Sequence, residues 1–171
     1  MSAAPAPVSL SEYLNTDYEP DCDYVDGFLE ERNVGKNKHS RTQTLLAVWL
    51  AAREAEQGFK VMTEQRVQVA PRRVRIPDIC LLERNDQDEV TQRPPLLWIE
   101  ILSPEDRWQR IQTRLNDALS FGVRTIWIID PYEKQAWIAT SERGTVPVED
   151  GGLRSTNPTL EVSLNEILPE D

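Results

Sequence analysis

Short apolar segments alternate along this chain with two longer segments of helical periodicity. In residues 42–56 and 107–121, apolar residues recur at spacings of three and four, the pattern of a helix with one face toward a core. Gly58 and Gly122 follow these segments, and glycine commonly ends a helix. We therefore predict two core-facing helices, over residues 42–56 and 107–121.

Strands are predicted from shorter patterns. One segment alternates between apolar and polar positions, as a half-buried strand does, and three others are short apolar runs of the kind found in buried strands. A further strand follows the turn at Asp130-Pro131. The pair Asp26-Gly27 lies between apolar positions and predicts a hairpin over residues 24–29. The strands are expected over residues 61–69, 76–82, 96–102, 125–129 and 135–140.

The remaining segments complete the expected fold. Ser9 is suited to cap a short helix over residues 10–14, residues 83–92 form a polar loop, and the tail holds a strand near Leu153 and a short helix over 164–167. Strands interleaved with core-facing helices favour an α/β fold, a mixed β-sheet flanked by helices. We expect a loose segment over residues 1–8 and a single domain over 9–171.

Length and composition limit the class of protein. With 171 residues, 39% of them hydrophobic, the chain is long enough for one soluble domain with a core. No apolar run approaches the roughly 20 residues of a transmembrane helix, and the N-terminus does not resemble a signal peptide. Cys22 and Cys80 are too far apart in sequence to form a metal-binding pair. We therefore expect a cytoplasmic protein without a membrane partner.

The charge distribution is uneven. The net charge is −10, but residues 32–75 contain ten Lys or Arg and three Asp or Glu, a local charge of +7, whereas the rest of the chain carries −17. Such a basic segment is suited to attract phosphate groups. A solvated helix and hairpin face is an equally compatible interpretation.

Two carboxylates stand in apolar surroundings. Asp78 follows Pro77 at the start of one predicted strand, and Glu100 lies inside the next. A buried carboxylate is costly unless it is paired or binds a metal, and oxygen ligands suit magnesium or manganese. The pair therefore predicts a site for one of these ions. The structural alternative is that each carboxylate sits at a strand end with its own salt-bridge partner.

The predicted helix over residues 107–121 carries three arginines beside its apolar stripe. At 100° per residue, Arg107, Arg110 and Arg114 lie along one edge of that stripe. Guanidinium groups in this place would meet both carboxylates and a phosphate. A solvated basic face, with Arg114 paired to Asp117, is the alternative. The stripe itself consists of Trp108, Ile111, Leu115, Ala118 and Leu119.

His39 and the tryptophans allow two interpretations each. His39, among Lys36, Lys38 and Arg41, is suited to contact phosphate or transfer a proton, or else is an exposed residue near a helix start. The five tryptophans fall mostly at core spacing, so we predict core positions rather than base-stacking surfaces. They are Trp49, Trp98, Trp108, Trp127 and Trp137.

Several motifs occur in the order found in one known family. Residues 75–82 (RIPDICLL) resemble its PD strand, and residues 98–107 (WIEILSPEDR) resemble its VEVLSPSDR strand and turn. Residues 121–131 (FGVRTIWIIDP) resemble its AGVxEYWIVDP segment, and residues 23–27 (DYVDG) its entry hairpin. Together, over about residues 9–140, the chain resembles the Uma2 family of restriction endonucleases, in the PD-(D/E)XK nuclease superfamily.

The resemblance implies roles for particular residues. Asp78 and Glu100 would bind the metal with the Ile101 carbonyl, and Asp23 would contact it through water. Arg114 stands where the family has a lysine, and because arginine does not lose its proton it is suited to stabilise phosphate charge but not to act as a base. Ala118 and Phe28 also depart from the family, replacing a tyrosine and a glutamate.

The resemblance also implies a restriction-endonuclease-like fold and function. We expect a magnesium- or manganese-dependent endonuclease that cuts DNA, with Asp78, Glu100 and Arg114 as catalytic residues. The metal would polarise the scissile phosphate and activate water. A homodimer is expected because a duplex has two strands. The alternative is a nuclease-fold module that binds nucleic acid or a protein partner without cleavage. The expected nucleic-acid contacts are Lys36, Lys38, His39, Arg41, Arg107 and Arg110.

Overall fold

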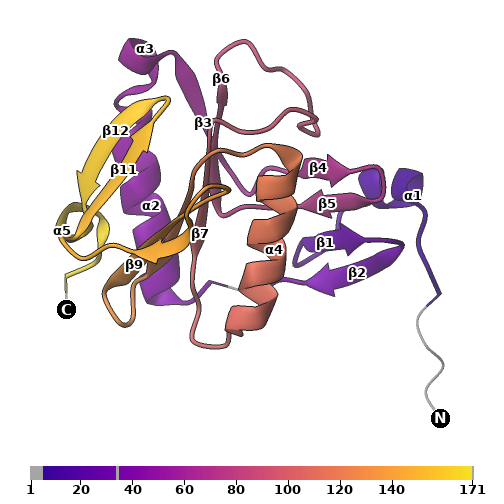
Figure 1. Cartoon of the computed structure of the whole chain (residues 1–171). Coiled ribbons are helices and arrows are strands. Elements are labelled where there is room, and N and C mark those ends of the chain that lie inside the picture. The colour runs from indigo at the N-terminus through magenta and orange to yellow at the C-terminus, as the bar shows by residue number, and fades with distance from the viewer. Residues whose placement is uncertain (1–5, 34, 171) are drawn as a thin grey trace.

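A computed structural model describes residues 6–33 and 35–170 of the chain (Figure 1). In its described part the chain begins with α1 (Leu10–Leu14), which Ser9 caps by accepting a hydrogen bond from the Glu12 amide at 3.1 Å, as predicted. Most of the predicted loose segment lies outside the described residues. Its last residue, Val8, is fixed to the hairpin, because its amide donates to the Gly27 carbonyl.

The centre of the fold is a mixed sheet, which in the described residues has six strands in the order β10-β9-β8-β7-β6-β3. β7 and β8 are parallel, and the other neighbours are antiparallel. The predicted fold class, a mixed sheet with helices beside it, is confirmed. The strands are β3 (Phe59–Thr63), β6 (Ile79–Glu83), β7 (Leu97–Ile101), β8 (Ile126–Asp130), β9 (Gln135–Thr140) and β10 (Gly144–Pro147).

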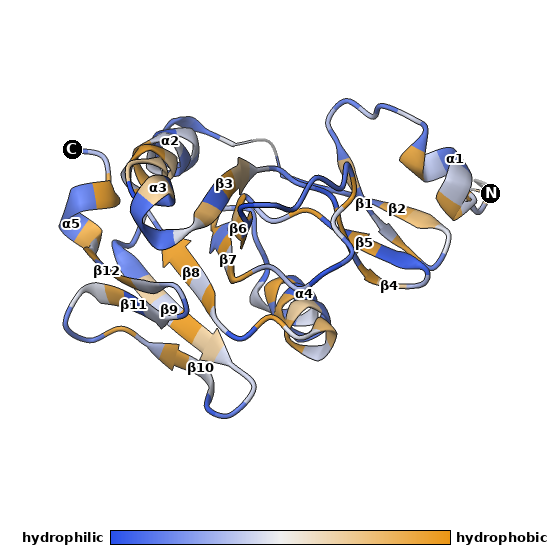
Figure 2. Ribbon diagram, turned by 90° about the horizontal axis from the view of Figure 1, so that it is seen from above, coloured by the Kyte–Doolittle hydropathy of each residue, from blue (hydrophilic) through white to orange (hydrophobic). Residues whose placement is uncertain are grey.

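The two long helices cover opposite faces of this sheet, α2 (Asn37–Ala51) one face and α4 (Trp108–Phe121) the other (Figures 1 and 2). Because side chains alternate along a strand, β7 contributes to both cores. Leu97 and Ile99 pack in the core that contains the α2 leucines, whereas Trp98 packs in the core formed with α4. By the same alternation, Glu100 is on the α4 side of the sheet.

A second sheet lies beyond α4, with the order β2-β1-β5-β4 (Figure 1). The hairpin of β1 and β2 turns at Asp26 and Gly27, whose φ angles of 52° and 101° are those of a tight turn that glycine favours. This confirms the predicted hairpin. Tyr13 and Tyr24 stack in a small core under α1, with ring centroids 5.1 Å apart. The strands are β1 (Cys22–Val25), β2 (Phe28–Glu31), β4 (Val67–Ala70) and β5 (Arg73–Arg75).

The C-terminal segment packs beside α2. It consists of β11 (Gly152–Thr156), β12 (Thr159–Ser163) and the short α5 (Leu164–Ile167). Leu153 and Ile167 are fully buried in the core on the α2 face, so this segment closes that side of the sheet. The predicted tail helix and the strand near Leu153 are confirmed, whereas β10 and β12 were missed.

Three predicted elements have different bounds. The strand expected over residues 61–69 is two strands, β3 and β4, in different sheets, because the chain turns at Glu64, which has a φ of 53°. The strand expected over 76–82 begins only at Ile79, after a link that follows β5. The helix expected over 42–56 is α2, which begins at Asn37, followed by the short α3 (Glu54–Gln57) and its left-handed cap Gly58.

The tryptophans divide into core and surface positions. Trp98 and Trp127 are fully buried, as predicted. Trp108 is wrong as a core residue, because 45% of it is exposed at the first position of α4, where its ring contacts Trp137 of β9. Within the described residues, no helix combines the length and the apolarity needed to cross a membrane.

Candidate active site

Asp78 and Glu100 face the same small cavity. Asp78 lies in the link that leads into β6, and Glu100 lies on β7. Both are buried, with exposed fractions of 5% and 4%. The Ile101 amide donates to Asp78 Oδ2 at 2.6 Å, so β7 itself holds the Asp78 carboxylate next to Glu100. The cavity measures about 40 Å³, enough space to hold water.

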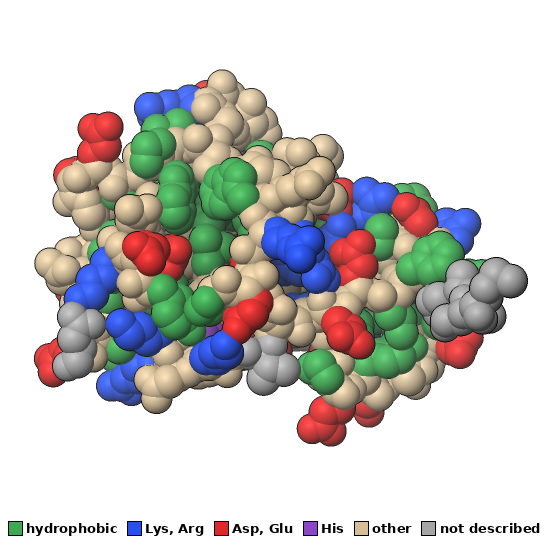
Figure 3. Space-filling view, turned by 90° about the horizontal axis from the view of Figure 1, so that it is seen from below, with side chains coloured by type: hydrophobic (Ala, Val, Ile, Leu, Met, Phe, Trp, Pro, Cys, Tyr) green, Lys and Arg blue, Asp and Glu red, His purple; other side chains and the backbone are tan. Residues whose placement is uncertain are grey.

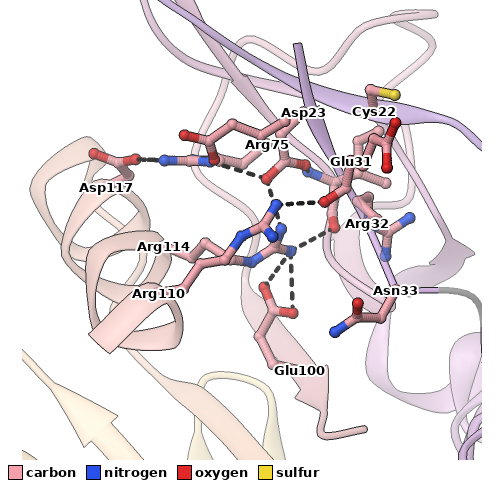
Figure 4. A network of polar contacts seen from close by, with 12 residues as sticks. Cys22, Asp23, Glu31, Arg32, Asn33, Arg75, Glu100, Arg110, Arg114 and Asp117 are labelled. Carbon is pink, nitrogen blue, oxygen red and sulfur yellow. Dashed lines mark hydrogen bonds and ion pairs between the residues drawn. The ribbon is translucent and has the colours of Figure 1, made fainter. Parts of the chain in front are cut away.

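Arg114 is the nearest cation to Glu100. Its Nη2 donates to both carboxylate oxygens of Glu100, at 2.9 and 3.1 Å, and to the Ile76 carbonyl at 2.9 Å (Figure 4). Its Nη1 contacts Asp23 Oδ2 at 2.5 Å. Because Ile111, Leu115 and Ala118 hold the apolar stripe of α4 on the sheet, Arg114 at its edge is buried. The alternative pairing of Arg114 with Asp117 is wrong.

Both carboxylate oxygens of Asp23 accept hydrogen bonds from protein groups. Besides Arg114, its carboxylate accepts from Arg75 Nη1 at 3.0 Å and from the Ile76 amide at 3.1 Å. Arg75 also reaches Asp117 of α4 at 2.8 Å and Glu30 at 2.6 Å. The second sheet is therefore joined to α4 through buried ion pairs that lead to Glu100 (Figure 4). Water-mediated metal contact by Asp23 stays a prediction.

Two further groups contact Asp78 Oδ1 from the other side. Arg32 Nη2 lies 3.0 Å away and His39 Nε2 lies 3.4 Å away. His39 is only 6% exposed and lines the cavity, so the interpretation as a solvent-exposed residue is wrong. Sequence reasoning did not single out Arg32 or Arg75, whose carboxylate partners lie far away in the sequence.

The electrostatic environment shifts the pKa values of Asp78 and Glu100 in opposite directions. Burial works to raise the pKa of Asp78, but the His39 hydrogen bond and the Arg32 charge outweigh it and lower that pKa. Burial raises the pKa of Glu100, with Arg114 acting against the rise and Asp78 adding to it. Burial disfavours the charged form of His39, yet the contact with Asp78 raises its pKa. Asp78 is thus the carboxylate held firmly as an anion.

The donor atoms at the cavity fit one hard cation with few protein ligands. Each carboxylate oxygen has two acceptor positions. Among the described residues, Asp78 Oδ2 and Glu100 Oε2 each receive a single hydrogen bond, so each keeps one position. No group of three or more His, Cys, Asp or Glu suited to a metal is found in the described ranges. An ion here would therefore depend on these two carboxylates, with backbone and water oxygens completing its shell.

The predicted nucleic-acid contacts are only partly gathered at the cavity. Arg110 lines it with His39 and donates to the Glu31 carbonyl, and Arg107 is exposed at the start of α4. Lys36 is paired with Glu105. Arg41 instead lines a groove between α2 and the C-terminal segment. Several other cations of the basic stretch are used in ion pairs, namely Arg32, Arg66, Arg73 and Arg75.

Comparison with known proteins agrees with this fold. A solved chain described as a putative nuclease belonging to DUF820, from Anabaena variabilis ATCC 29413, superposes with a TM-score of 0.83 at 19% identity, covering 94% of this chain and 97% of the other. No curated protein sequence matches the chain. The model of the Uma2 family, described as "Putative restriction endonuclease", matches residues 10–169. The chain therefore belongs to the Uma2 family of restriction-endonuclease-like proteins.

Proposed function

We propose that this protein is a magnesium- or manganese-dependent endonuclease that cleaves DNA at the cavity of Asp78 and Glu100. The observation that carries the proposal is the convergence of these two buried carboxylates on one cavity lined by Arg32, His39, Arg110 and Arg114. Paired carboxylates suit a divalent cation, and guanidinium groups around them suit a phosphodiester. Membership of the Uma2 family supports the nuclease class.

The metal would be held by Asp78 and Glu100, with the Ile101 carbonyl and Asp23 as the further proposed contacts. When bound, such an ion supplies Lewis acidity to a phosphoryl oxygen and lowers the pKa of a water molecule. The hydrogen bond from the Ile101 amide fixes Asp78, and Arg114 fixes Glu100, so both carboxylates are oriented before substrate arrives. This preorganisation is the main contribution of the fold.

The cations at the cavity would act on the phosphate. Arg110 is exposed on the cavity side of α4, so it is placed to bind the phosphodiester. Arg114 would offset the charge that builds on the phosphate oxygens, although it must share its guanidinium with Glu100. Arginine keeps its proton, so Arg114 is not proposed as a general base. His39, the one histidine of the sequence, is proposed to contact phosphate beside Asp78.

The proposed partner is DNA. The protein is proposed to act on it as a homodimer, so that each copy cleaves one strand. The proposed location is the cytoplasm. Lys36, Lys38, Arg41 and Arg107 are the proposed additional phosphate contacts. Lys36 would exchange its pairing with Glu105 for a phosphate when DNA binds.

A cleavage assay tests the proposal. Supercoiled and linear DNA would be incubated with the protein in magnesium, in manganese and in EDTA, beside Asp78→Ala and Asp86→Asn. Asp86 is also a buried carboxylate, 3% exposed, but it lies outside the cavity, so its variant controls for general damage. We expect metal-dependent cleavage by the wild type and by Asp86→Asn, and none by Asp78→Ala. Absence of cleavage with either ion, or equal cleavage by Asp78→Ala, would contradict the proposal.

A further inference from the structure

Arg32 joins a buried carboxylate of the cavity to the protein surface. Its Nη2 lies 3.0 Å from Asp78 Oδ1, and its Nη1 lies 3.3 Å from Glu64 Oε2. The side chain of Asp78 is 7% exposed and that of Glu64 is 52% exposed, so the two ends of the guanidinium lie in different surroundings. A pair with an exposed carboxylate contributes little free energy. The outer contact of Arg32 is therefore easily given up.

The charge of Asp78 is already balanced in this arrangement. Its Oδ1 is contacted by Arg32 Nη2 and by His39 Nε2, which occupy the two acceptor positions of that oxygen. Its Oδ2 accepts from the Ile101 amide. A divalent ion on Asp78 would meet a guanidinium of the same sign on the same carboxylate. The ion and Arg32 therefore compete for Asp78, because like charges at this separation repel.

Arg114 does not share the freedom of Arg32. Its Nη2 donates to both oxygens of Glu100, and its Nη1 contacts Asp23. Both of these carboxylates are buried, so Arg114 cannot leave without stranding a buried charge. Glu100 thus has a permanent counter-ion, whereas the counter-ion of Asp78 has a second partner at the surface.

The backbone that carries Arg32 is held on both sides. β2 ends at Glu31, whose carbonyl accepts from Arg110, and Asn33 donates to Asp106 Oδ1 at 2.7 Å (Figure 4). A change of partner by Arg32 is therefore a movement of its side chain alone. That side chain has several rotatable bonds and ends in a planar fork that matches a phosphate as well as a carboxylate.

The face on which α2 and α4 begin holds charges of both signs. Seen from below, its Lys and Arg side chains lie among Asp and Glu side chains (Figure 3). Lys36 on this side of the molecule is paired with Glu105, as Arg32 is with Asp78 and Glu64. A phosphate group that approaches the cavity therefore gains these cations by an exchange of partners.

We infer that Arg32 changes partners when the site is loaded. It balances Asp78 in the metal-free protein, and it moves to a phosphate of the nucleic acid once Asp78 binds the ion. Ion and nucleic acid then bind cooperatively, because each favours the state of Arg32 that the other needs. This inference deepens the proposed function and rests on it for the metal site, but its test requires binding and not cleavage.

Calorimetry with manganese in the absence of DNA tests the first half of the exchange. Arg32→Gln removes the charge, while its amide can still donate to Asp78, so the buried carboxylate keeps a partner. Because the competing guanidinium is gone, manganese should bind about fivefold more tightly than in the wild type. Arg73→Gln is the matched control and should bind manganese like the wild type. Arg73 likewise joins a largely buried carboxylate, Asp117, to an exposed one, Asp26, but it lies outside the cavity lining.

Stopped-flow anisotropy with a labelled DNA duplex tests the second half before cleavage proceeds. In EDTA Arg32 stays with Asp78, so Arg32→Gln should bind DNA about as well as the wild type. In manganese only the wild type gains the phosphate contact, so Arg32→Gln should bind about tenfold more weakly. Arg32→Lys restores the charge without the fork and should lie between the two. A variant that is merely misfolded would lose DNA affinity under both conditions.

The inference is overturned if manganese affinity is unchanged or weaker in Arg32→Gln, or if the loss of DNA affinity is the same in EDTA and in manganese. A protein that shows both shifts but cuts no DNA would disprove the proposed nuclease and leave the exchange standing. A protein that cuts DNA but shows neither shift would do the reverse. A wild type that binds no manganese would contradict both.

Discussion

Arg114 donates through one nitrogen to both carboxylate oxygens of Glu100, at 2.9 and 3.1 Å. Its other terminal nitrogen contacts Asp23. All three side chains are buried. The guanidinium thus supplies a fixed positive charge next to a carboxylate that is proposed to bind a divalent ion.

Removing the Arg114 charge should destabilise the protein. Arg114→Ala would leave Glu100 and Asp23 buried with one partner fewer, and breaking a buried ion pair typically costs about 3–5 kcal/mol. Urea denaturation should show a loss of this size in the free energy of unfolding. Arg124→Ala removes an exposed arginine shortly after the same helix and should change it by less than about 0.5 kcal/mol. Equal stability of both variants would show that the Arg114 pairs contribute nothing net.

Replacing Arg114 by lysine should increase cleavage. Lysine keeps the positive charge, but unlike arginine it is able to lose its proton when buried. A positioned proton-transfer group contributes typically about 10²–10⁴-fold, so even a partial effect in Arg114→Lys is measurable as a faster single-turnover rate. A binding module without cleavage would show no metal-dependent rate in either the wild type or Arg114→Lys. A variant slower than the wild type would mean that the guanidinium itself is needed.

Glu100 should be required for manganese binding. Glu100→Gln keeps the size of the side chain but removes the charge that a divalent ion needs. Isothermal calorimetry should show at least about tenfold weaker manganese binding than in the wild type. Asp86→Asn, a buried carboxylate elsewhere, should bind like the wild type. Unchanged affinity in Glu100→Gln would remove Glu100 from the set of ligands.

The cations at the start of α2 should make the DNA affinity depend on the salt concentration. Each phosphate contact contributes a slope of about −0.9 to the dependence of log affinity on log salt. If Lys36, Lys38 and Arg41 each make one contact, replacing all three by alanine reduces the magnitude of the slope by about 2.7. Anisotropy titrations between low and moderate salt measure this slope. The double variant Arg124→Ala and Arg143→Ala is the control. An unchanged slope would exclude this surface.

Much of the fold followed from local patterns. The hairpin at Asp26-Gly27 and the helix ending at Gly122 were predicted because their signals lie within a few residues. The split between β3 and β4 was missed, because alternation continues through residues 61–69 and does not reveal that the chain changes sheets at Glu64. Strand β10 was missed because it is a short edge strand with little buried surface.

The sequence predicted only those residues of the candidate site that are unusual in their local sequence. Asp78 and Glu100 stood out because carboxylates are rare in apolar strands. Arg32 and Arg75 did not, since an arginine in a polar or hairpin segment looks ordinary. Their importance comes from partners 46 and 52 residues away in sequence. Likewise, the helical spacing of Trp108 does not reveal that this first position of α4 is 45% exposed.

The contact between Asp23 and Arg114 joins residues 91 positions apart. A chain made from its N-terminus produces β1 long before α4 exists. Until α4 arrives, Asp23 lacks one of its two arginine partners and Glu100 lacks Arg114. Of the two cavity carboxylates, Glu100 is therefore paired with Arg114 only after α4 has been synthesised. An incomplete chain that ends before α4 would therefore carry Asp23 and Glu100 without the guanidinium that pairs with both.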